Sequence, residues 1–235
     1  MRLPIPSSVE VDPIDAYSRT RWVGGRLMCA SSKIASVDGA AFIEKRSKAL
    51  GGPADKAIFA APRSLYDVIL VAAATMCTEG YSPVRLDDNA WGRRHQWGLA
   101  WLPSVVVITR ACRCAWISPF FTEAEQRRIV IIVPAAATSD RDRAAVVTVA
   151  DDDVDLVRMM RALDELGHDN VLAEGGLRVA AQLASAELHE PCPTVSVGGD
   201  ARRILDDDPL EVPTPLDVRH VLEADGYLFL RHLRR

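Results

Sequence analysis

Residues 170–177 read Asn170-Val171-Leu172-Ala173-Glu174-Gly175-Gly176-Leu177, a short apolar strand that runs into two glycines and then into a helix. Glycines let the backbone approach a ligand closely, and a helix N-terminus presents unpaired N–H groups to an anion. Two glycines also make a simple tight turn between a strand and a helix, so both interpretations stay open. The pattern is not G-x-G-x-x-G, and the sequence therefore does not predict a standard Rossmann domain.

Further buried strands are predicted from short apolar runs that are rich in β-branched residues. The predicted strands cover residues 26–30, 67–72, 104–109, 129–133, 145–149, 170–173, 193–197 and 226–230. Helices are predicted from about residue 53 to Ala61, before Pro62, and at about residues 154–166 and 177–186. Strands that alternate with helices indicate an α/β fold, with a mostly parallel central sheet and helices on its faces.

Two segments lack a clear hydrophobic period and are expected to lie outside this sheet. Residues 1–20 are rich in Pro, Ser and Asp and are predicted to form an N-terminal arm, which leaves residues 21–235 as one domain. Residues 86–103 contain three tryptophans and are predicted to form a surface excursion.

The bulk composition favours a globular protein of the cytoplasm. Hydrophobic residues make up 49% of the 235 residues, and the net charge of −4 gives no electrostatic reason to expect nucleic acid or an anionic membrane as a partner. No apolar run is long enough to span a bilayer, and the first residues lack the apolar region of a secretory signal. Five scattered cysteines suit a reducing compartment, and no metal site is predicted because no second Cys or His pair stands at metal-ligand spacing.

Two further patterns place polar residues near the ends of predicted strands. Residues 71–75, Val-Ala-Ala-Ala-Thr, end a buried strand in small residues and a hydroxyl, and Glu79-Gly80-Tyr81 follows. Ligands of open α/β sheets bind outside the carboxyl ends of strands. Asp38 lies in a turn and Asp55 lies near a helix start. Each could bind a polar substrate group or could simply stabilise its turn or helix end.

Six motifs in this order resemble the reductase domain of bacterial riboflavin biosynthesis, over roughly residues 26–232. They are Ser36-Val37-Asp38-Gly39-Ala40, Gly51-Gly52-Pro53-Ala54-Asp55, the apolar strand ending in Thr75 with Glu79-Gly80-Tyr81, Val171-Leu172-Ala173-Glu174-Gly175-Gly176, Gly198-Gly199-Asp200-Ala201 and Asp225-Gly226-Tyr227-Leu228-Phe229. The resemblance implies a dihydrofolate-reductase-like fold with an antiparallel last strand. It also implies reduction of a small molecule, 5-amino-6-(5-phosphoribosylamino)uracil, with NADPH by a homodimer.

The resemblance also implies roles for individual residues. The cofactor NADPH would be contacted by Thr75, Glu174, Gly175, Gly176 and Leu177, and the substrate pocket would be formed or shaped by Ser36, Asp38, Asp55 and Glu79. Hydride would pass from the nicotinamide to a ring-opened imine carbon of the sugar. Asp38 and Glu174 are the candidate catalytic residues, because they are the ionisable groups placed where a proton could be donated.

Two alternatives stay open at the level of sequence. The same fold could reduce a folate-like or pterin-like substrate, since a fold does not fix a substrate. The chain could also be a catalytically silent relative, because alanines stand at positions 72 and 74, where family members usually carry glycines in a Gly-x-Gly-Thr pattern. Their methyl groups would narrow the space for a dinucleotide.

Overall fold

The computed structural model describes residues 9–18, 28–44, 46–109, 118–123, 129–134, 145–150, 155–186, 188–196 and 215–234. Its elements follow in the order α1 (Pro13–Ser18), β1 (Met28–Ser36), the 3-10 turn η1 (Ser47–Ala49), α2 (Pro53–Leu65), β2 (Val68–Ala72), α3 (Ala73–Glu79), α4 (Asp88–Gln96), β3 (Ser104–Ile108), α5 (Pro119–Thr122), β4 (Ile129–Pro134), β5 (Ala145–Ala150), α6 (Leu156–Glu165), β6 (Asn170–Gly175), α7 (Leu177–Ala186), β7 (Leu188–Ser196), β8 (Leu216–Ala224) and β9 (Tyr227–Arg234).

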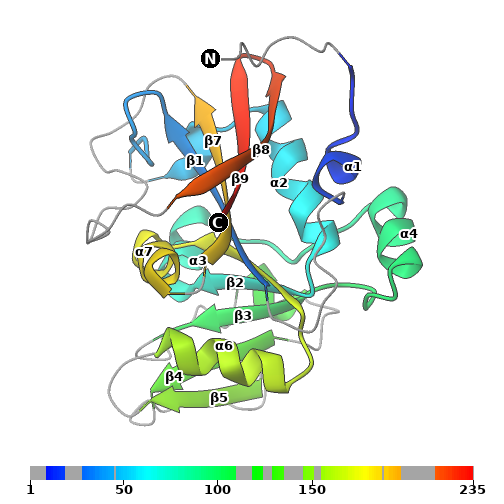
Figure 1. Ribbon diagram of the computed structural model, residues 1–235. Coiled ribbons are helices and arrows are strands. Elements are labelled where there is room, and N and C mark those ends of the chain that lie inside the picture. The colour runs from blue at the N-terminus through cyan, green and yellow to red at the C-terminus, as the bar shows by residue number, and fades with distance from the viewer. Residues whose placement is uncertain are drawn as a thin grey trace.

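A single sheet with the strand order β5-β4-β3-β2-β6-β1-β7-β9-β8 forms the centre of the protein. All neighbours from β5 to β7 pair in parallel, whereas β9 is antiparallel to both β7 and β8. Figure 1 shows α6 lying across the β3–β5 part of the sheet, with the β8–β9 hairpin at the other end. The predicted α/β class, parallel sheet and antiparallel last strand are therefore confirmed.

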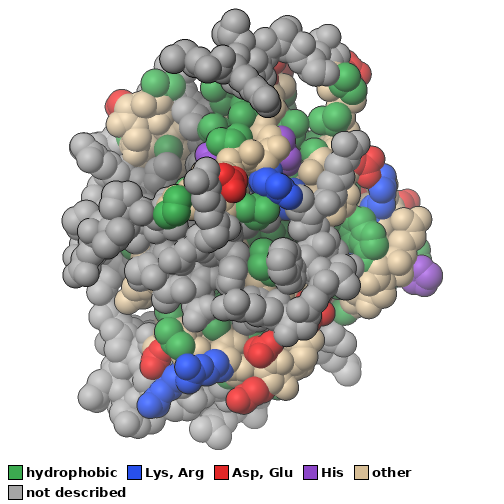
Figure 2. Space-filling view, viewed as in Figure 1, with side chains coloured by type: hydrophobic (Ala, Val, Ile, Leu, Met, Phe, Trp, Pro, Cys, Tyr) green, Lys and Arg blue, Asp and Glu red, His purple; other side chains and the backbone are tan. Residues whose placement is uncertain are grey.

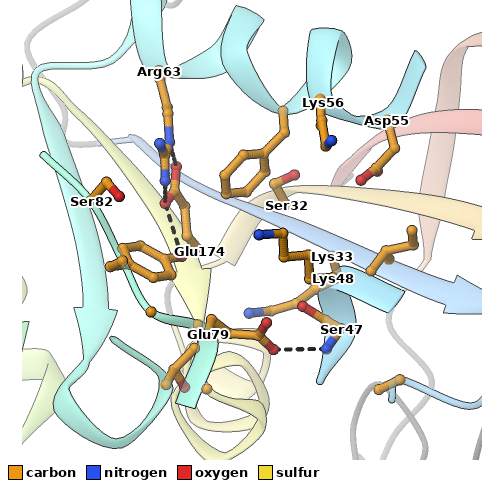
Figure 3. Close-up of a pocket in the computed structure, with 18 of the residues that line it drawn as sticks. Ser32, Lys33, Ser47, Lys48, Asp55, Lys56, Arg63, Glu79, Ser82 and Glu174 are labelled. Atoms are coloured by element: carbon orange, nitrogen blue, oxygen red, sulfur yellow. Dashed lines mark hydrogen bonds and ion pairs between the residues drawn. The ribbon is translucent and has the colours of Figure 1, made fainter. Parts of the chain in front are cut away.

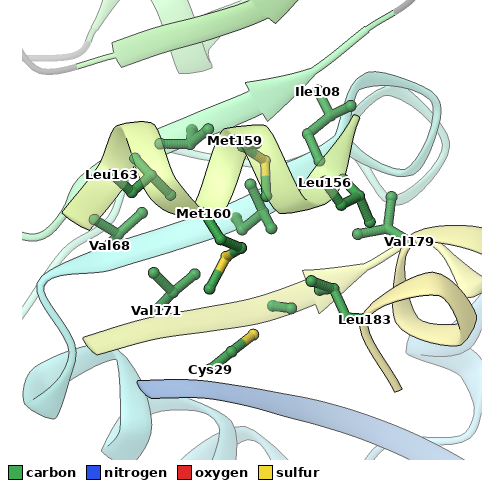
Figure 4. Packing of buried hydrophobic residues seen from close by; sticks show 13 residues of the cluster. Cys29, Val68, Ile108, Leu156, Met159, Met160, Leu163, Val171, Val179 and Leu183 are labelled. Atoms are coloured by element: carbon green, nitrogen blue, oxygen red, sulfur yellow. The ribbon is translucent and has the colours of Figure 1, made fainter. Parts of the chain in front are cut away.

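Alternate residues of the central strands pack on opposite faces of the sheet. Val68 and Leu70 of β2 join a core beneath α6 and α7, which Met159, Leu163 and Leu183 complete (Figure 4). Ile69 and Val71 of β2 point to the opposite face, into a second core with α3 and α5. Strands buried on both faces are apolar at every position, which is why their sequences read as continuous runs.

Helix α6 shows how the sequence encodes this layering. Leu156, Met159 and Leu163 recur at helical spacing and are buried, while charged residues occupy the outward face. Figure 2 shows these acidic and basic side chains together over the lower part of the molecule. Asp155 caps the helix by accepting the N–H groups of residues 157 and 158.

Residues 13–18 of the predicted N-terminal arm form the helix α1, which packs against the domain. Tyr17 is buried in a core shared with α2 and β9, and the guanidinium of Arg231 donates to the carbonyls of Ala16 and Tyr17 at 3.3 and 2.8 Å. Asp15 also pairs with Arg93 of α4 at 2.6 Å. The composition does not predict this helix, because it has no long apolar face. It is attached by the buried ring of Tyr17 and by the carbonyls at its C-terminal end. The predicted boundary at residues 20 and 21 lies outside the described residues.

The predicted surface excursion at residues 86–103 contains the helix α4, which lies outside the sheet. Asp87 caps the helix by accepting the N–H of Ala90 at 2.8 Å. Arg94 is fully buried and donates to the carbonyls of Ser64, Tyr66 and Ala100 at 3.3, 2.8 and 2.7 Å. These bonds attach α4 to the C-terminal end of α2 and offset the cost of burying the charge.

Several predicted boundaries also move. The first strand begins by Met28 and runs to Ser36 rather than ending at Ala30, and residues 26–27 lie outside the described part. Helix α2 passes through Pro62 to Leu65, because the proline stands in its last turns and costs one intrahelical bond. β7 begins at Leu188, earlier than predicted, and β9 extends to Arg234. β8 was not predicted at all, although Leu216, Val218 and His220 alternate with polar residues.

The hairpin holds a histidine whose environment predicts a pH dependence. Burial, together with the nearby Arg231 charge, lowers the pKa of His220 to about 4. The folded protein keeps this ring neutral while the unfolded chain takes up a proton below about pH 6.5, so stability should fall as the pH drops from 6.5 towards 4. We expect this loss to be about 1 kcal/mol, since the ring is partly exposed and its charge is screened.

Urea unfolding of wild type and His220→Gln at about pH 7.5, above this range, and at about pH 5, inside it, checks this prediction. The stability difference between the two pH values should shrink in His220→Gln and should persist in His95→Gln, which changes an exposed histidine of α4. An unchanged difference in His220→Gln would contradict it.

None of the described helices is long and apolar enough to cross a membrane.

Candidate functional site

A cavity of about 310 Å³ opens at the carboxyl ends of β2 and β6 (Figure 3). β1 pairs with β6 only from Met28 to Ser31, and the next residues, Ser32 to Ile34, line the cavity. The other walls come from α2 and from residues 41–42, 47–48 and 79–83. Open α/β sheets bind ligands at this edge, and the volume lies at the lower end of the ~300–1,000 Å³ of ligand sites. Six of the sequence-predicted site residues meet there: Asp55, Thr75, Glu79, Glu174, Gly175 and Gly176.

Glu174 owes its position to an irregularity in β6. β2 pairs Leu70 with Ala173 and Val71 with Gly175, so Glu174 is the extra residue of a bulge. A bulge re-aims one side chain without ending the strand. The carboxylate is fully buried and points towards α2 rather than into open solvent.

Both oxygens of that carboxylate are held. Arg63 donates Nε to Oε1 at 2.6 Å and Nη2 to Oε2 at 2.7 Å, and the Tyr81 hydroxyl donates to Oε2 at 3.1 Å. We call this arrangement of Arg63, Tyr81 and Glu174 the carboxylate clamp. The guanidinium also stacks 4.4 Å from the ring centre of Phe59. A two-pronged pair of this kind is the strongest form of charge-assisted hydrogen bond.

The clamp shifts the pKa values of both partners of Glu174. Burial opposes the charge of Arg63, but the attraction of Glu174 and its hydrogen bonds outweigh this, and the pKa of Arg63 lies above its usual value. Burial, reinforced by the Glu174 charge, raises the pKa of Tyr81 well above 10. Tyr81 therefore acts as a neutral hydrogen-bond donor at every physiological pH.

Gly175 and Gly176 leave space for a side chain of the protein itself. A Cβ at Gly175 would lie 2.5 Å from Cγ2 of Thr75, and a Cβ at Gly176 would lie 2.9 Å from the Thr75 hydroxyl oxygen. Thr75 therefore fills part of the space beside the two glycines that was predicted to hold a ligand. Its hydroxyl is brought to the start of α7, whose first residue is Leu177 and whose first turn includes the bond from Ala180 N–H to the Gly176 carbonyl.

The three alanines before Thr75 do not narrow the cavity. Ala72 ends β2 and its Cβ lies 3.7 Å from the position of a Cβ on Gly176. Ala73 is buried in the core with α3, and Ala74 is exposed. None of the three lines the cavity.

Lys33 is the cationic group in the middle of the site. It extends from β1 into the cavity, and in Figure 3 its ammonium lies between the clamp and Lys48. Burial lowers the pKa of Lys33 to about 8, against the opposing attraction of Glu174. Among the described residues, no ion pair involves Lys33, Lys48 or Lys56, which all line the cavity.

Ser36 and Asp38 are not brought to the cavity. The Ser36 hydroxyl is hydrogen-bonded to the Asp38 carboxylate and also accepts the Ala40 N–H at 3.0 Å, so the two residues build the turn after β1. The hydrogen bond from the Ser36 hydroxyl, more than the backbone hydrogen bonds of the turn, lowers the pKa of Asp38, whose side chain is exposed. Asp38 is thus an anion near neutral pH.

Glu79 fixes one end of the short segment of residues 47–50, which contributes Ser47 and Lys48 to the cavity wall. Its carboxylate accepts the Ser47 N–H at 2.7 Å, and the Tyr227 hydroxyl donates to the Leu50 carbonyl at 3.0 Å. Asp55 lies beside this segment, with a carboxylate oxygen 2.5 Å from where a Cβ on Gly51 would stand. The short segment that carries Lys48 is thereby fixed at both ends.

Sequence reasoning missed Lys33, Phe59 and Arg63 and quoted Tyr81 without giving it a role. A lysine among Ser31, Ser32 and Ile34 is unusual for a buried strand, but the predicted strand stopped before it. Among the described residues no group of three His, Cys, Asp or Glu side chains could hold a metal.

The residues present suit a phosphate-bearing cofactor such as NADPH. Arg63 neutralises Glu174, so the acidic residue beside the glycine turn does not repel an anion. Gly175 and Gly176 present backbone rather than side chains to the cavity, at the N-terminal end of α7. Lys48 and Lys56 form no ion pair with a described residue, so their positive charge can offset the negative charge of a phosphate in the cavity.

Comparison with known proteins agrees with this architecture. A pyrimidine reductase-like protein from Corynebacterium diphtheriae superposes with a TM-score of 0.79 at 19% identity, covering 89% of this chain and 92% of that one. A diaminohydroxyphosphoribosylaminopyrimidine deaminase/5-amino-6-(5-phosphoribosylamino)uracil reductase from Thermotoga maritima gives 0.72 at 18% identity, with 89% of this chain and 57% of that chain covered.

A dihydrofolate reductase from Enterococcus faecalis gives a TM-score of 0.52 at 10% identity over 88% of this chain and 96% of that one. These likenesses establish the fold, and they confirm the predicted dihydrofolate-reductase-like architecture. No protein with a curated description matches the sequence. The sequence does match the family described as the RibD C-terminal domain, over residues 30–222. Because this match extends over most of the chain, the protein belongs to the RibD C-terminal domain family, the reductase domain of riboflavin biosynthesis.

Proposed function

We propose that this protein binds NADPH and reduces the ribosylamino group of 5-amino-6-(5-phosphoribosylamino)uracil. The observation that carries the proposal is the cavity itself, where the glycine turn before α7 and the ammonium of Lys33 face one space beside the sheet. Membership of the family supports the reductase class. The name of the Thermotoga protein supports the substrate.

The cofactor would be held at the turn between β6 and α7. The Thr75 hydroxyl and the backbone of Gly175 and Gly176 would contact it, and Leu177 contributes the first N–H of α7. Bound there, the reduced nicotinamide supplies a hydride. Asp55 and Glu79 line the other side of the cavity, where polar groups of the substrate would bind.

Reduction of the ring-opened sugar adds a hydride to the imine carbon and a proton to the imine nitrogen. We assign the proton to the Lys33 ammonium, since its pKa near 8 makes it a usable acid close to neutral pH. Asp38 lies outside the cavity, and both oxygens of Glu174 already accept hydrogen bonds from the clamp. We therefore assign proton donation to Lys33 instead of to Asp38 or Glu174.

The homodimer implied by the resemblance stays a prediction. The β8–β9 hairpin offers a surface for it, because Leu216, Val218, Val221 and Leu228 are exposed at the edge of the sheet. Exposed apolar edges of this kind are usually covered in an assembly.

Titration of the purified protein with NADPH, followed by cofactor fluorescence, tests the proposal. We expect saturable binding, and Thr75→Val should weaken it by roughly tenfold because one hydrogen bond is lost while the side-chain shape is kept. Thr122→Val, on the exposed side of α5, should bind like wild type. Absence of saturable binding up to millimolar cofactor would reject the reductase function and would favour a catalytically silent relative.

A further inference from the structure

The carboxylate clamp joins three parts of the chain that meet at the cavity wall. Arg63 comes from α2, Glu174 from the bulge of β6, and Tyr81 from the segment after α3. The side chain of Arg63 is one-fifth exposed and that of Glu174 is not exposed at all, so the ion pair has little contact with water. A fully desolvated carboxylate needs such partners, because burying it alone costs several kcal/mol.

Glu174 has a second cation within electrostatic reach. Lys33 lies across the cavity on β1, and Glu174 is the carboxylate whose attraction opposes the lowering of its pKa. The guanidinium fork matches both carboxylate oxygens at once, whereas an ammonium is a point charge. The carboxylate therefore pairs with Arg63, and Lys33 has no ion pair with any described residue.

The remaining charges around Lys33 do not take over this role. The ionisable residues that share the cavity with it are Lys48, Asp55, Lys56, Arg63, Glu79, Tyr81 and Glu174. Glu79 already accepts the Ser47 N–H, and Tyr81 is a donor to Glu174. Of the three carboxylates in the cavity, only Glu174 acts on the pKa of Lys33, and Asp55 and Glu79 do not, so Glu174 is the anion whose orientation matters for the Lys33 ammonium.

We propose that Arg63 is a positioning residue, which with Tyr81 holds the Glu174 carboxylate away from Lys33 and so keeps the Lys33 ammonium free to act on a bound substrate. This inference rests on the proposed function for its catalytic meaning, but its structural content concerns the free protein. It also gives Glu174 a role other than proton donation, although Glu174 is the ionisable residue of the glycine motif.

Competitive acetylation of the amine at Lys33 with acetic anhydride, as a function of pH, tests the proposal without cofactor or substrate. Mass spectrometry of the peptide gives the pH at which Lys33 becomes half reactive. In Arg63→Gln the released Glu174 should pair with Lys33, and this midpoint should rise by about 1–3 pH units. Tyr81→Phe removes one of the three bonds and should move it upwards by less.

The double variant Arg63→Gln/Glu174→Gln separates the clamp from a simple loss of positive charge. If Arg63 acts through Glu174, the midpoint in the double variant should stay near that of Glu174→Gln alone. An equal rise with and without Glu174, or no rise in Arg63→Gln, would overturn the proposal. Arg63→Lys keeps the charge but not the fork, and if Arg63→Gln fails to fold it provides the same comparison, with a smaller rise.

The outcome is independent of the proposed function. A Glu174-dependent shift of Lys33 in a protein that does not bind NADPH would support the clamp and reject the reductase. Binding and turnover of NADPH without such a shift would support the reductase and reject the clamp.

Discussion

Replacing Lys33 by methionine should lower kcat by about 10²–10⁴-fold, the usual contribution of a general acid. The substitution keeps the length and apolar stem of the side chain and removes the group that we assign to protonation of the imine nitrogen. NADPH should still bind, because its contacts lie at Thr75 and the glycine turn. Turnover of 5-amino-6-(5-phosphoribosylamino)uracil, followed by the loss of NADPH absorbance, measures the effect.

Two controls separate this loss from damage to the fold. Arg158→Met removes a positive charge at an exposed residue of α6 that does not line the cavity, and it should retain wild-type kcat. Lys33→Met should be at least as stable as wild type at neutral pH, because a buried ammonium with a lowered pKa disfavours the folded state below that pKa. Wild-type kcat should fall above about pH 8 as Lys33 loses its proton. A Lys33→Met enzyme with normal turnover would refute the assignment.

Gly175→Ala should destabilise the protein by about 3 kcal/mol, the upper end of the cost of overpacking. The added Cβ would stand 2.5 Å from Cγ2 and 3.1 Å from Cβ of Thr75, so rotation of the Thr75 side chain alone leaves a close contact. The displaced turn should also weaken NADPH binding. Urea unfolding measures the first effect and cofactor titration the second.

The structure supplies a compensating change for Gly175→Ala. Thr75→Ser removes the methyl group in the 2.5 Å contact and keeps the hydroxyl, so Gly175→Ala/Thr75→Ser should regain part of the lost stability. Gly92→Ala is the matched control, since Gly92 lies in α4 with nothing within 4 Å and should gain about 0.5–1 kcal/mol. Equal stability of Gly175→Ala and wild type would mean that Thr75 does not fill this space.

The sheet could be predicted from sequence because its strands carry their own signal. Runs such as Val105-Val106-Val107-Ile108 are apolar at every position, and this happens when both faces are covered. Helix α1 could not be predicted in this way, since Tyr17 and the carbonyls that Arg231 binds meet only in the folded chain. α4 was hidden for a similar reason, because its anchor is a buried arginine rather than an apolar face.

The candidate site was predicted in part for the same physical reason. Glycine and threonine motifs are local, and the rule that ligands bind at the carboxyl ends of strands brought Thr75 and the glycine turn together. The β6 bulge is not visible in the sequence, and without it Glu174 reads as a free carboxylate. Lys33 and Arg63 are far from these motifs along the chain, and their roles depend on which of them Glu174 pairs with.

Arg94 connects the helix α4 to the wall of the cavity, although Arg94 itself does not line it. Its guanidinium binds the carbonyls of Ser64 and Tyr66, the residues that follow Arg63 along the chain. The end of α2, directly after the clamp arginine, is therefore held by a second, buried arginine. Substitution of Arg94 should therefore disturb the position of Arg63 as well as the packing of α4.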